Sequence, residues 1–399
     1  MDKNTIIGFV LIAALLIGFS WYTQPSEEDI AKQRMQDSIT ALAKKKAEES
    51  RNAEAQASNQ NAQNNVNADT TAVFYKSLSG KAQNIILKNS KLELTLSTKG
   101  GTVEKAVIKD FKDNKGNKDL TLFDSKDQSL KFMLEGKETN IITSDLYFTP
   151  SNITDSTVTM TAVGSNGRSL VMNYKLGKNY LLHFSLKANG MSGLFSPNYN
   201  KLDIEWTDHC RQQEKGFTFE NRYASLTYHF TDGGTDYISE TSEKVDEKIE
   251  DAIDWVAFKN QFFSAVMIAK DDLGTNSLMT SIPQEKGSGY LKQYGAKVKT
   301  SFDPTGNNST ELEFYYGPND FRLLQKIEKE STFNKDLELH RLVYLGWPLF
   351  RIINRWFTLY VFDWLTGLNI NMGIVLILIT LLLKVITYPL VKKSYMSSA

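Results

Sequence analysis

The chain has 399 residues, 46 basic and 46 acidic side chains, and a single cysteine, Cys210. A formal net charge of zero gives no overall attraction to nucleic acid, so a nucleic-acid-binding role is disfavoured. One cysteine excludes an internal disulfide and a metal site built from several Cys ligands. Apolar residues make up 41% of the chain. They gather in one stretch near each end, which fits a polar body with one or two membrane spans better than a polytopic membrane protein.

The N-terminal stretch has the length of a membrane span. No charged residue lies between Lys3 and Glu27, and Ile6 to Trp21 is almost wholly apolar. At 1.5 Å per residue, a helix of this length reaches across a hydrocarbon core of ~30 Å. Trp21 lies at its outer end, where amphipathic rings prefer the membrane boundary. We therefore expect a transmembrane helix over residues 1–23, with a cleaved secretory signal as the alternative.

Residues 24–73 differ in composition from everything that follows. They are rich in Ala, Asn, Gln and charged residues and contain few large apolar side chains. Such a segment cannot bury enough apolar surface to offset the entropy cost of ordering it. We expect residues 24–73 to form a flexible tether.

From Val73 the apolar residues recur with a period of two, as expected for half-buried strands. The clearest alternations are Leu92, Leu94 and Leu96; Leu170, Met172, Tyr174 and Leu176; and Leu182, Phe184 and Leu186. Glycine-containing turns separate these runs. Repeated short strands of this kind favour antiparallel sheets packed as a large sandwich, so the fold class is mainly β over residues 74–335. One helical patch is expected within this domain, because Val245, Ile249, Ala252 and Ile253 follow helical spacing.

This β domain carries no recognisable catalytic motif. HExxH, GxSxG, P-loop and dinucleotide-binding patterns are absent from the sequence, and His183, His209, His229 and His340 have no ligand spacing among them. His183 falls on the polar side of a strand and is expected at the surface. The adjacent residues Asp208, His209 and Cys210 could suggest a nucleophile with a base. Adjacent strand residues point to opposite faces, however, so neighbours in sequence rarely form such a pair. We therefore expect no enzymatic activity, no cofactor and no bound metal.

An aromatic-rich stretch precedes the second apolar block. Residues 346–369 hold three of the six Trp residues of the chain and place arginines on one side of a helix. This pattern is typical of a helix that lies in the membrane boundary, and we assign it to residues 336–366. A helix packed on the β domain, or one that already begins the span, is the alternative.

The second expected span covers residues 367–391. Trp364 to Leu383 holds twenty uncharged residues, and Lys392 and Lys393 follow the span closely. By the positive-inside rule these lysines mark the cytoplasmic side, where residues 392–399 would begin a cytoplasmic region. The expected topology thus has two spans, both termini in the cytoplasm and the β domain outside.

Lys384 is the candidate site residue. It lies eight residues before Lys392, hence ~12 Å inside the cytoplasmic end of a straight helix. A charge at mid-membrane costs about 2.5–3.5 kcal/mol on insertion scales. Its ammonium either reaches the headgroups along the helix or faces a water-containing cavity that binds polar groups. Pro389 would help to open such a cavity by kinking the helix.

The C-terminal stretch, residues 346–399, closely resembles the YidC-type membrane protein insertases. In that family an amphipathic helix precedes a span with a basic residue, a Tyr-Pro-Leu and a polar tail, which here match Lys384, Tyr388–Leu390 and Lys392–Ser398. Upstream stretches similar to family elements are Trp255–Phe263 (WVAFKNQFF), Tyr316–Pro318 (YGP) and Ser97–Gly101 (STKGG). Together these matches cover nearly the whole chain apart from the tether.

The resemblance implies a periplasmic antiparallel β-supersandwich similar to galactose-mutarotase-like folds, with N- and C-terminal transmembrane helices in the bacterial inner membrane. It implies an insertase and chaperone whose substrates are nascent membrane proteins. Lys384 would be the positive residue of a hydrophilic groove that attracts acidic or polar substrate segments, at a position where many members have Arg. The lipid bilayer, Sec translocon subunits and the ribosome would be the partners; nucleic acid and small-molecule substrates would not.

Family members continue beyond the second span with a cytoplasmic hairpin and further spans, so we expect this chain to represent the N-terminal part. Two other functions remain open from the residues. One is a membrane-anchored mutarotase-like sugar-binding protein or epimerase, which requires a His and a carboxylate that converge in a groove of the sandwich. The other is a bitopic adaptor whose outer domain binds translocon subunits.

Overall fold

The computed structural model describes residues 73–113, 116, 119–238, 244–344, 354–368 and 370–397, and gives the backbone alone for residues 355, 356 and 389–397. All of these belong to one unit, Val73–Ala399. The expected first span over residues 1–23 and nearly all of the expected tether lie outside the described residues.

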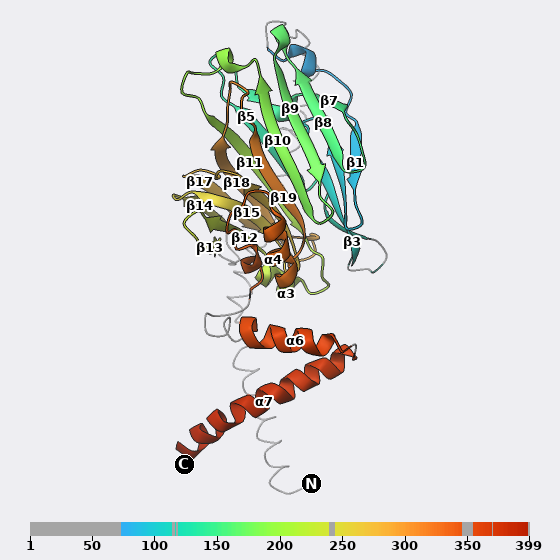
Figure 1. Cartoon of the computed structure of the whole chain (residues 1–399), viewed down its shortest axis with the longest axis vertical. Coiled ribbons are helices and arrows are strands. Elements are labelled where there is room, and N and C mark those ends of the chain that lie inside the picture. The colour runs from blue at the N-terminus through green and yellow to red at the C-terminus, as the bar shows by residue number, and fades with distance from the viewer. Residues whose placement is uncertain are drawn as a thin grey trace, which may run out of the picture. The chain divides into compact units, whose positions relative to one another are not determined.

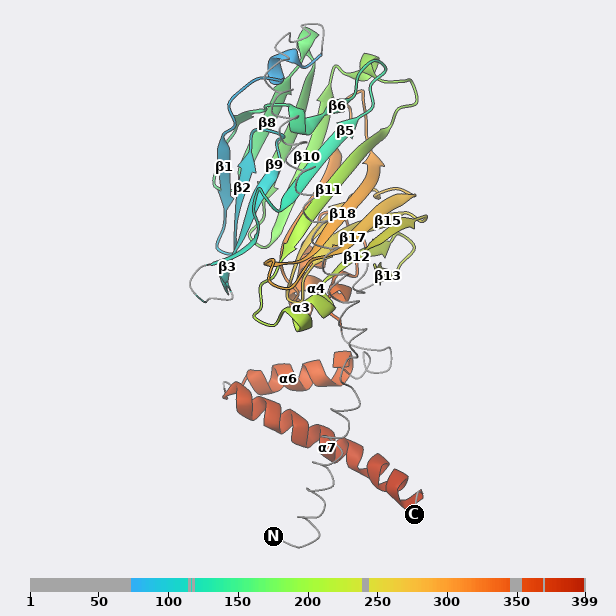
Figure 2. The same cartoon turned by 180° about the vertical axis from the view of Figure 1, so that it is seen from behind.

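The described strands form three antiparallel sheets (Figures 1 and 2). The four-stranded sheet has the order β1 (Asn84–Lys88), β2 (Leu92–Ser97), β3 (Val103–Lys112), β4 (Asp119–Phe123). The nine-stranded sheet has the order β13 (Thr235–Tyr237), β12 (Ser225–Phe230), β15 (Ile253–Lys259), β16 (Phe263–Ala269), β19 (Thr310–Pro318), β10 (Leu181–Asn189), β9 (Ser169–Leu176), β8 (Thr157–Val163), β7 (Thr149–Ser151). The six-stranded sheet has the order β14 (Val245–Ile249), β17 (Ser277–Pro283), β18 (Tyr290–Ser301), β11 (Lys201–Arg211), β5 (Gln128–Leu134), β6 (Ile141–Ile142).

Helices and short helical turns connect or follow these strands. The helices are α3 (Phe217–Tyr223), α4 (Phe321–Glu330), α6 (Leu359–Thr366) and α7 (Met372–Ser397). The 3-10 turns are η1 (Tyr75–Ser77), η2 (Thr143–Asp145), η3 (Ser165–Gly167), η4 (Ser192–Leu194) and η5 (Leu339–Leu342), and η6 (Asn354–Thr358) is a π-helical turn.

Aromatic contacts show how the sheets pack. Trp206 of β11 stacks on Phe258 of β15 with ring centroids 4.0 Å apart, which joins the six-stranded sheet to the nine-stranded one. Phe123 of β4 contacts Tyr316 of β19 at 5.3 Å, which joins the four-stranded sheet to the same nine-stranded sheet. These side chains are buried. The mainly β, antiparallel sandwich expected from the alternating pattern is therefore confirmed.

The individual alternations are confirmed as well. In β2, Leu92, Leu94 and Leu96 are fully buried between half-buried polar residues. β9 and β10 bury alternate residues in the same way and pair with each other, so their apolar side chains share one face. That face contributes to the common core of the sheets.

The helical patch expected at Val245 to Ile253 is wrong. Val245–Ile249 is strand β14 and Ile253–Lys259 is strand β15, and the two belong to different sheets. All seven residues of β15 are buried, as expected for a strand inside a sheet that is covered on both faces. A few apolar residues at helical spacing cannot be distinguished from the ends of two strands that lie close in sequence.

The stretch assigned to an amphipathic helix, residues 336–366, has two different parts where it is described. Leu337, Leu339 and Leu342 are buried in the core of the β domain, and η5 is a short 3-10 turn. Helix α6 follows only at Leu359–Thr366, and residues 345–353 of this stretch lie outside the described residues.

Helices α6 and α7 meet where α6 ends and α7 begins (Figure 1). Leu365, Val375 and Ile379 form a small buried cluster between them. Gly367 follows the last residue of α6 and is the first residue of the expected second span. Within the part of the chain that the structure describes, no helix combines the length and the apolar character needed to cross a membrane.

Candidate functional site

The WVAFKNQFF and YGP stretches, far apart in sequence, meet at one end of the nine-stranded sheet. The loop between β15 and β16 is closed by Asn260, whose side-chain oxygen accepts hydrogen bonds from the backbone N–H groups of Phe262 and Phe263. The backbone N–H of Asn319, which follows the YGP stretch, donates to the Phe262 carbonyl at 2.6 Å. The Asn319 side-chain amide lies 3.3 Å from the Asn260 carbonyl. The two stretches thus form one structural junction.

Gly317 is required by the packing of this junction. The Tyr315 hydroxyl donates to the Pro318 carbonyl at 2.6 Å and so crosses the position of Gly317. A Cβ atom on Gly317 would lie 2.7 Å from the Tyr315 ring and 3.0 Å from Tyr180. No larger residue fits here without displacement of a buried tyrosine.

The same strand β15 also holds the segment that leaves the β domain. We call residues 335–343 the strap. The Trp255 indole N–H donates to the Leu337 carbonyl at 2.7 Å, and the Lys259 ammonium donates to the Leu342 carbonyl at 3.3 Å. Both donors are buried. The WVAFK stretch therefore anchors the strap at two points against the face of the nine-stranded sheet opposite to the other two sheets.

A buried charge cluster adds to this anchor. His229 is 1% exposed and stacks on Trp255, with its ring nitrogens 3.5 Å from Asp254 and 3.5 Å from Glu338. Lys335 donates to Asp254 at 2.6 Å. Burial opposes ionisation of Asp254, but the nearby His229 ring and the hydrogen bond from Lys335 outweigh it and hold the pKa of Asp254 below its usual value. The cluster links strands β12 and β15 to the strap.

Helix α4 covers the strap from the other side. Glu328 accepts hydrogen bonds from the backbone N–H groups of Leu337 and Glu338, at 3.0 and 3.1 Å. It also lies 3.8 Å from His340, whose ring contacts Phe321. Burial opposes ionisation of Glu328, yet the nearby His340 ring and the hydrogen bond from the Glu338 backbone lower the pKa of Glu328. The strap is thus held between a sheet face and a helix.

A third His–carboxylate pair lies on the same sheet. His183 Nδ1 is 3.0 Å from Glu313 Oε1, beside a hollow of about 160 Å³. The same Glu313 oxygen accepts from the backbone N–H and the hydroxyl of Thr332, at 2.9 and 2.7 Å. His183 is half-buried rather than at the surface as expected. Because Glu313 is already engaged by the backbone after α4, the pair fastens that segment to the sheet.

The Asp208-His209-Cys210 run behaves as strand geometry predicts. Asp208 and Cys210 of β11 are buried on the core side, whereas His209 lies on the other side and contacts Tyr290. Burial raises the pKa of both the Asp208 carboxyl and the Cys210 thiol. Burial thus favours the uncharged form of both groups. Among the residues with a described structure, no set of three or more His, Cys, Asp or Glu side chains is placed to hold a metal ion.

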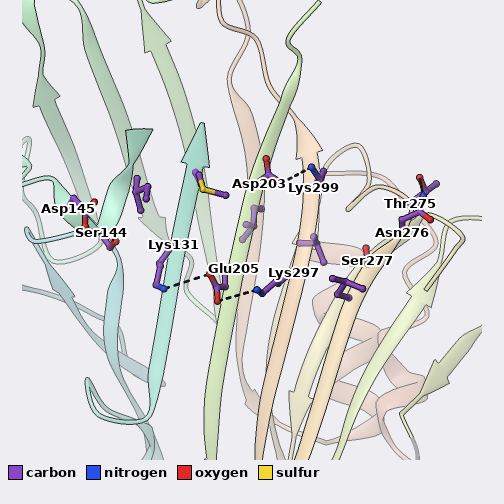
Figure 3. Close-up of a pocket in the computed structure, with 15 residues that line it drawn as sticks. Lys131, Ser144, Asp145, Asp203, Glu205, Thr275, Asn276, Ser277, Lys297 and Lys299 are labelled. Carbon is purple, nitrogen blue, oxygen red and sulfur yellow. Dashed lines mark hydrogen bonds and ion pairs between the residues drawn. The ribbon is translucent and has the colours of Figure 1, made fainter. Parts of the chain in front are cut away.

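The outer face of the six-stranded sheet carries two neighbouring hollows of about 470 and 440 Å³. Glu205 of β11 lies between Lys131 of β5 and Lys297 of β18, at 3.7 and 4.0 Å, and Lys299 pairs with Asp203 at 2.9 Å (Figure 3). Asp203 and Glu205 are thus each matched by a lysine on a neighbouring strand. Neither hollow is lined by a His or Cys.

Lys384, the residue singled out from the sequence, lies on α7 with an exposed side chain. Its carbonyl accepts a hydrogen bond from the Thr387 hydroxyl one turn later. Large apolar side chains next to it are exposed too, including Val385 at 71% and Leu381 at 55%. The backbone is helical through Pro389. The structure thus places Lys384 among apolar side chains that have no protein cover within the described residues.

The sequence did not reveal the anchoring role of Trp255, Lys259 and Glu313. Lys259 and Glu313 carried a signal, because a charged residue inside an apolar strand pattern is buried only when it is paired. Their partners lie up to 130 residues away in sequence, and only the folded sheet brings them together.

Comparison with known proteins connects these stretches to one family. Residues 84–360 match the family described as the YidC periplasmic domain. Curated relatives called membrane protein insertase YidC are 49% identical in Phocaeicola vulgatus, 42% in Bacteroides fragilis and 35% in Parabacteroides distasonis. Each alignment covers 100% of this chain and 64% of the relative. The chain thus spans somewhat less than two thirds of the length of these relatives.

Two kinds of solved structure are similar in part. YidC from Thermotoga maritima is 14% identical over 79% of this chain and 71% of that chain, with a TM-score of 0.35. A galactose mutarotase related enzyme from Lactobacillus acidophilus is 10% identical over 59% and 97%, with a TM-score of 0.37. Both TM-scores are under 0.5, and the sheet architecture rests on the strand pairing described above. On the match of residues 84–360 and the similarity along the whole sequence, the chain belongs to the YidC family.

Proposed function

We propose that this chain is part of a membrane protein insertase and chaperone that helps integral membrane proteins to insert and fold. The observation that carries this proposal is the 49% identity, along the whole chain, to a relative called membrane protein insertase YidC. That similarity favours an insertase over a membrane-anchored epimerase or a bitopic adaptor. The proposed activity needs no covalent chemistry, cofactor or metal, because it consists of binding and placing a polypeptide.

In this proposal residues 1–23 and 367–391 cross the bacterial inner membrane, both termini lie in the cytoplasm, and residues 74–335 form a periplasmic domain. The exposed side chains of α7 support the assignment of the second span. Leu376, Ile377 and Leu381 are 56%, 60% and 55% exposed. A contiguous apolar surface of this kind is unfavourable in water and favourable against lipid tails.

Lys384 is the proposed substrate-binding residue. Its side chain is exposed on α7, one turn after Leu381. A positive charge beside a low-dielectric region attracts an acidic segment far more strongly than the same charge in bulk water. Lys384 would draw acidic or polar outer segments of a nascent membrane protein into the inner half of the bilayer. Lysine acts here as a point charge, so attraction does not depend on a bidentate geometry.

The proposed partners follow from this role. Nascent membrane proteins are the substrates and the lipid bilayer is the surroundings of α7. Sec translocon subunits and the ribosome are proposed as further partners, since both deliver such substrates.

The test is charge reversal at position 384 in a version of the protein with the full length of its relatives. Lys384→Glu should abolish the insertion of substrates with acidic outer tails, measured by protease protection in proteoliposomes, and Lys384→Arg should retain it. Substrates with neutral tails should be less affected. Undiminished insertion of acidic-tailed substrates by the Lys384→Glu variant would contradict the role given to this charge.

A further inference from the structure

One end of the β domain exposes aromatic rings to solvent. We call Phe219, Tyr223, Phe262 and Tyr344 the aromatic end. Phe219 is 56% exposed, Phe262 45% and Tyr344 57%. Phe219 contacts Tyr223 at 5.3 Å, and Tyr223 contacts Tyr344 at 6.5 Å, so three of the rings form a continuous row.

Strand pairing places all four rings at the same end of the nine-stranded sheet. Tyr223 ends α3, just before β12, and the first residue of β12, Ser225, pairs with Lys259 at the end of β15. Phe262 lies in the loop that follows Lys259. Tyr344 follows Leu342, whose carbonyl is held by that same Lys259. In Figures 1 and 2, α3 and α4 lie together at this end in both views.

The chemistry of the aromatic end suits the boundary between lipid headgroups and tails. Tyrosine rings combine an apolar body with a polar tip, and aromatic residues gather at that boundary. Lys215 and Arg222, beside and on α3, are exposed and can meet headgroup phosphates. A protein partner would not require cations beside the rings, whereas an anionic lipid surface is attracted by them.

The course of the chain also points to the membrane. Tyr344 directly precedes the segment with Trp347, Trp356 and Trp364, which the sequence assigns to the membrane boundary. Tyr344 itself is fixed close to the sheet, because Leu342 is held by Lys259. The aromatic end is therefore the part of the β domain that the chain brings nearest to this segment.

We propose that the aromatic end rests on the bilayer, with Phe219, Phe262 and Tyr344 inserted at the level of the headgroups. This inference depends on the proposed function, since it requires α7 to be in the membrane. Burial of these three exposed rings is favourable, because it removes apolar surface from water.

The experiment uses the whole chain in nanodiscs of phosphatidylethanolamine and phosphatidylglycerol. Cysteine is introduced at Phe219 or Phe262 and labelled with an environment-sensitive dye, since Cys210 is buried. Matched control labels replace Leu78 and Val163, which are 43% and 47% exposed at the opposite end of the nine-stranded sheet. A label at Ile377 of α7 tests the membrane placement itself.

The aromatic-end labels should emit at shorter wavelength and be quenched by lipids with a spin label near the headgroup, and the control labels should not. If the Ile377 label is quenched by lipid and the Phe219 and Phe262 labels are not, the inference about the aromatic end is overturned while the proposed function stands. If the Ile377 label is not quenched either, the membrane placement of α7 and the inference that depends on it are both overturned. Labels at Phe219 and Phe262 that are shielded from iodide but not quenched by lipid would indicate a protein partner and also overturn the inference.

Discussion

The β domain buries large apolar side chains, whereas helices α6 and α7 expose side chains of the same kinds. Trp255, on the central strand β15, is fully buried and bonded to the strap, whereas Trp364, on α6, is 65% exposed. Leucines of β2 are fully buried, while Leu376 and Leu381 of α7 are 56% and 55% exposed. The β domain thus buries its apolar side chains within itself, whereas those of α6 and α7 have little protein cover among the described residues, as the proposed membrane placement of α7 requires.

The largest expected effect comes from removing one tryptophan side chain from each region. Trp255→Ala should destabilise the β domain by about 3–5 kcal/mol, because it opens a cavity in the core and also removes the bond to the Leu337 carbonyl. Trp364→Ala in detergent should leave β-domain stability nearly unchanged. Both effects are measured by chemical denaturation followed with far-UV circular dichroism. Equal losses in the two variants would show that α6 shares the β-domain core.

The junction offers a second, smaller effect. Gly317→Ala should cost about 1–3 kcal/mol, since the new methyl group must displace Tyr315 or Tyr180. Gly193→Ala is the matched control, because nothing lies within 4 Å of a Cβ atom at that position. Thermal unfolding of the two variants gives the difference. A Gly317→Ala variant as stable as the control would mean that the junction is looser than its contacts indicate.

The smallest expected effect is the pH dependence of the strap. The pKa values of Asp254 and Glu338 are lowered in the folded state. The effect of burial is outweighed at Asp254 by the nearby His229 ring and the hydrogen bond from Lys335, and at Glu338 by the ion pair with Arg341. A lowered pKa stabilises the fold above the unfolded value, about 4 for these groups, and this contribution is lost as the pH falls through the folded pKa.

Hydrogen exchange of the strap should therefore be unchanged from neutral pH down to about pH 4, after correction for intrinsic rates, and should rise below it. Asp254→Asn should expose the strap to faster exchange already at neutral pH and flatten the acid response. An acid response that is equally steep in Asp254→Asn would assign it to other carboxylates.

The sequence was sufficient for the features that depend on local pattern. The alternation in β2, β9 and β10 predicted both the strands and their buried faces. It failed at β14 and β15, because Val245, Ile249 and Ile253 satisfy a helical period although they lie on two strands of different sheets. The charged pattern of residues 246–251 gave no strand signal that could compete.

The candidate site could be predicted only in part for a physical reason. Lys384 stands out locally, as a charge within an apolar run. The bonds that hold the strap do not stand out in the sequence, because Trp255 and Leu337 are 82 residues apart and meet only after the sheet has formed. Likewise, His229 lies between Asp254 of β15 and Glu338 of the strap, and nothing in the sequence links these three positions.

The bond from Lys259 to Leu342 also fixes the place where the chain leaves the β domain toward α6 and α7. From Tyr344 to Asn354 there are ten peptide steps, and a fully stretched chain of that length reaches at most about 35 Å. That length is an upper limit on the distance between Tyr344 and Asn354, and it is close to the thickness of a bilayer core. A direct contact also joins α4 to α6, because Arg322 pairs with Asp363 at 3.1 Å and lies 5.0 Å from the centre of the Tyr360 ring. Without the bond from Lys259 to Leu342, the last bond from β15 before this segment would be the one from Trp255 to Leu337, five residues earlier in the chain.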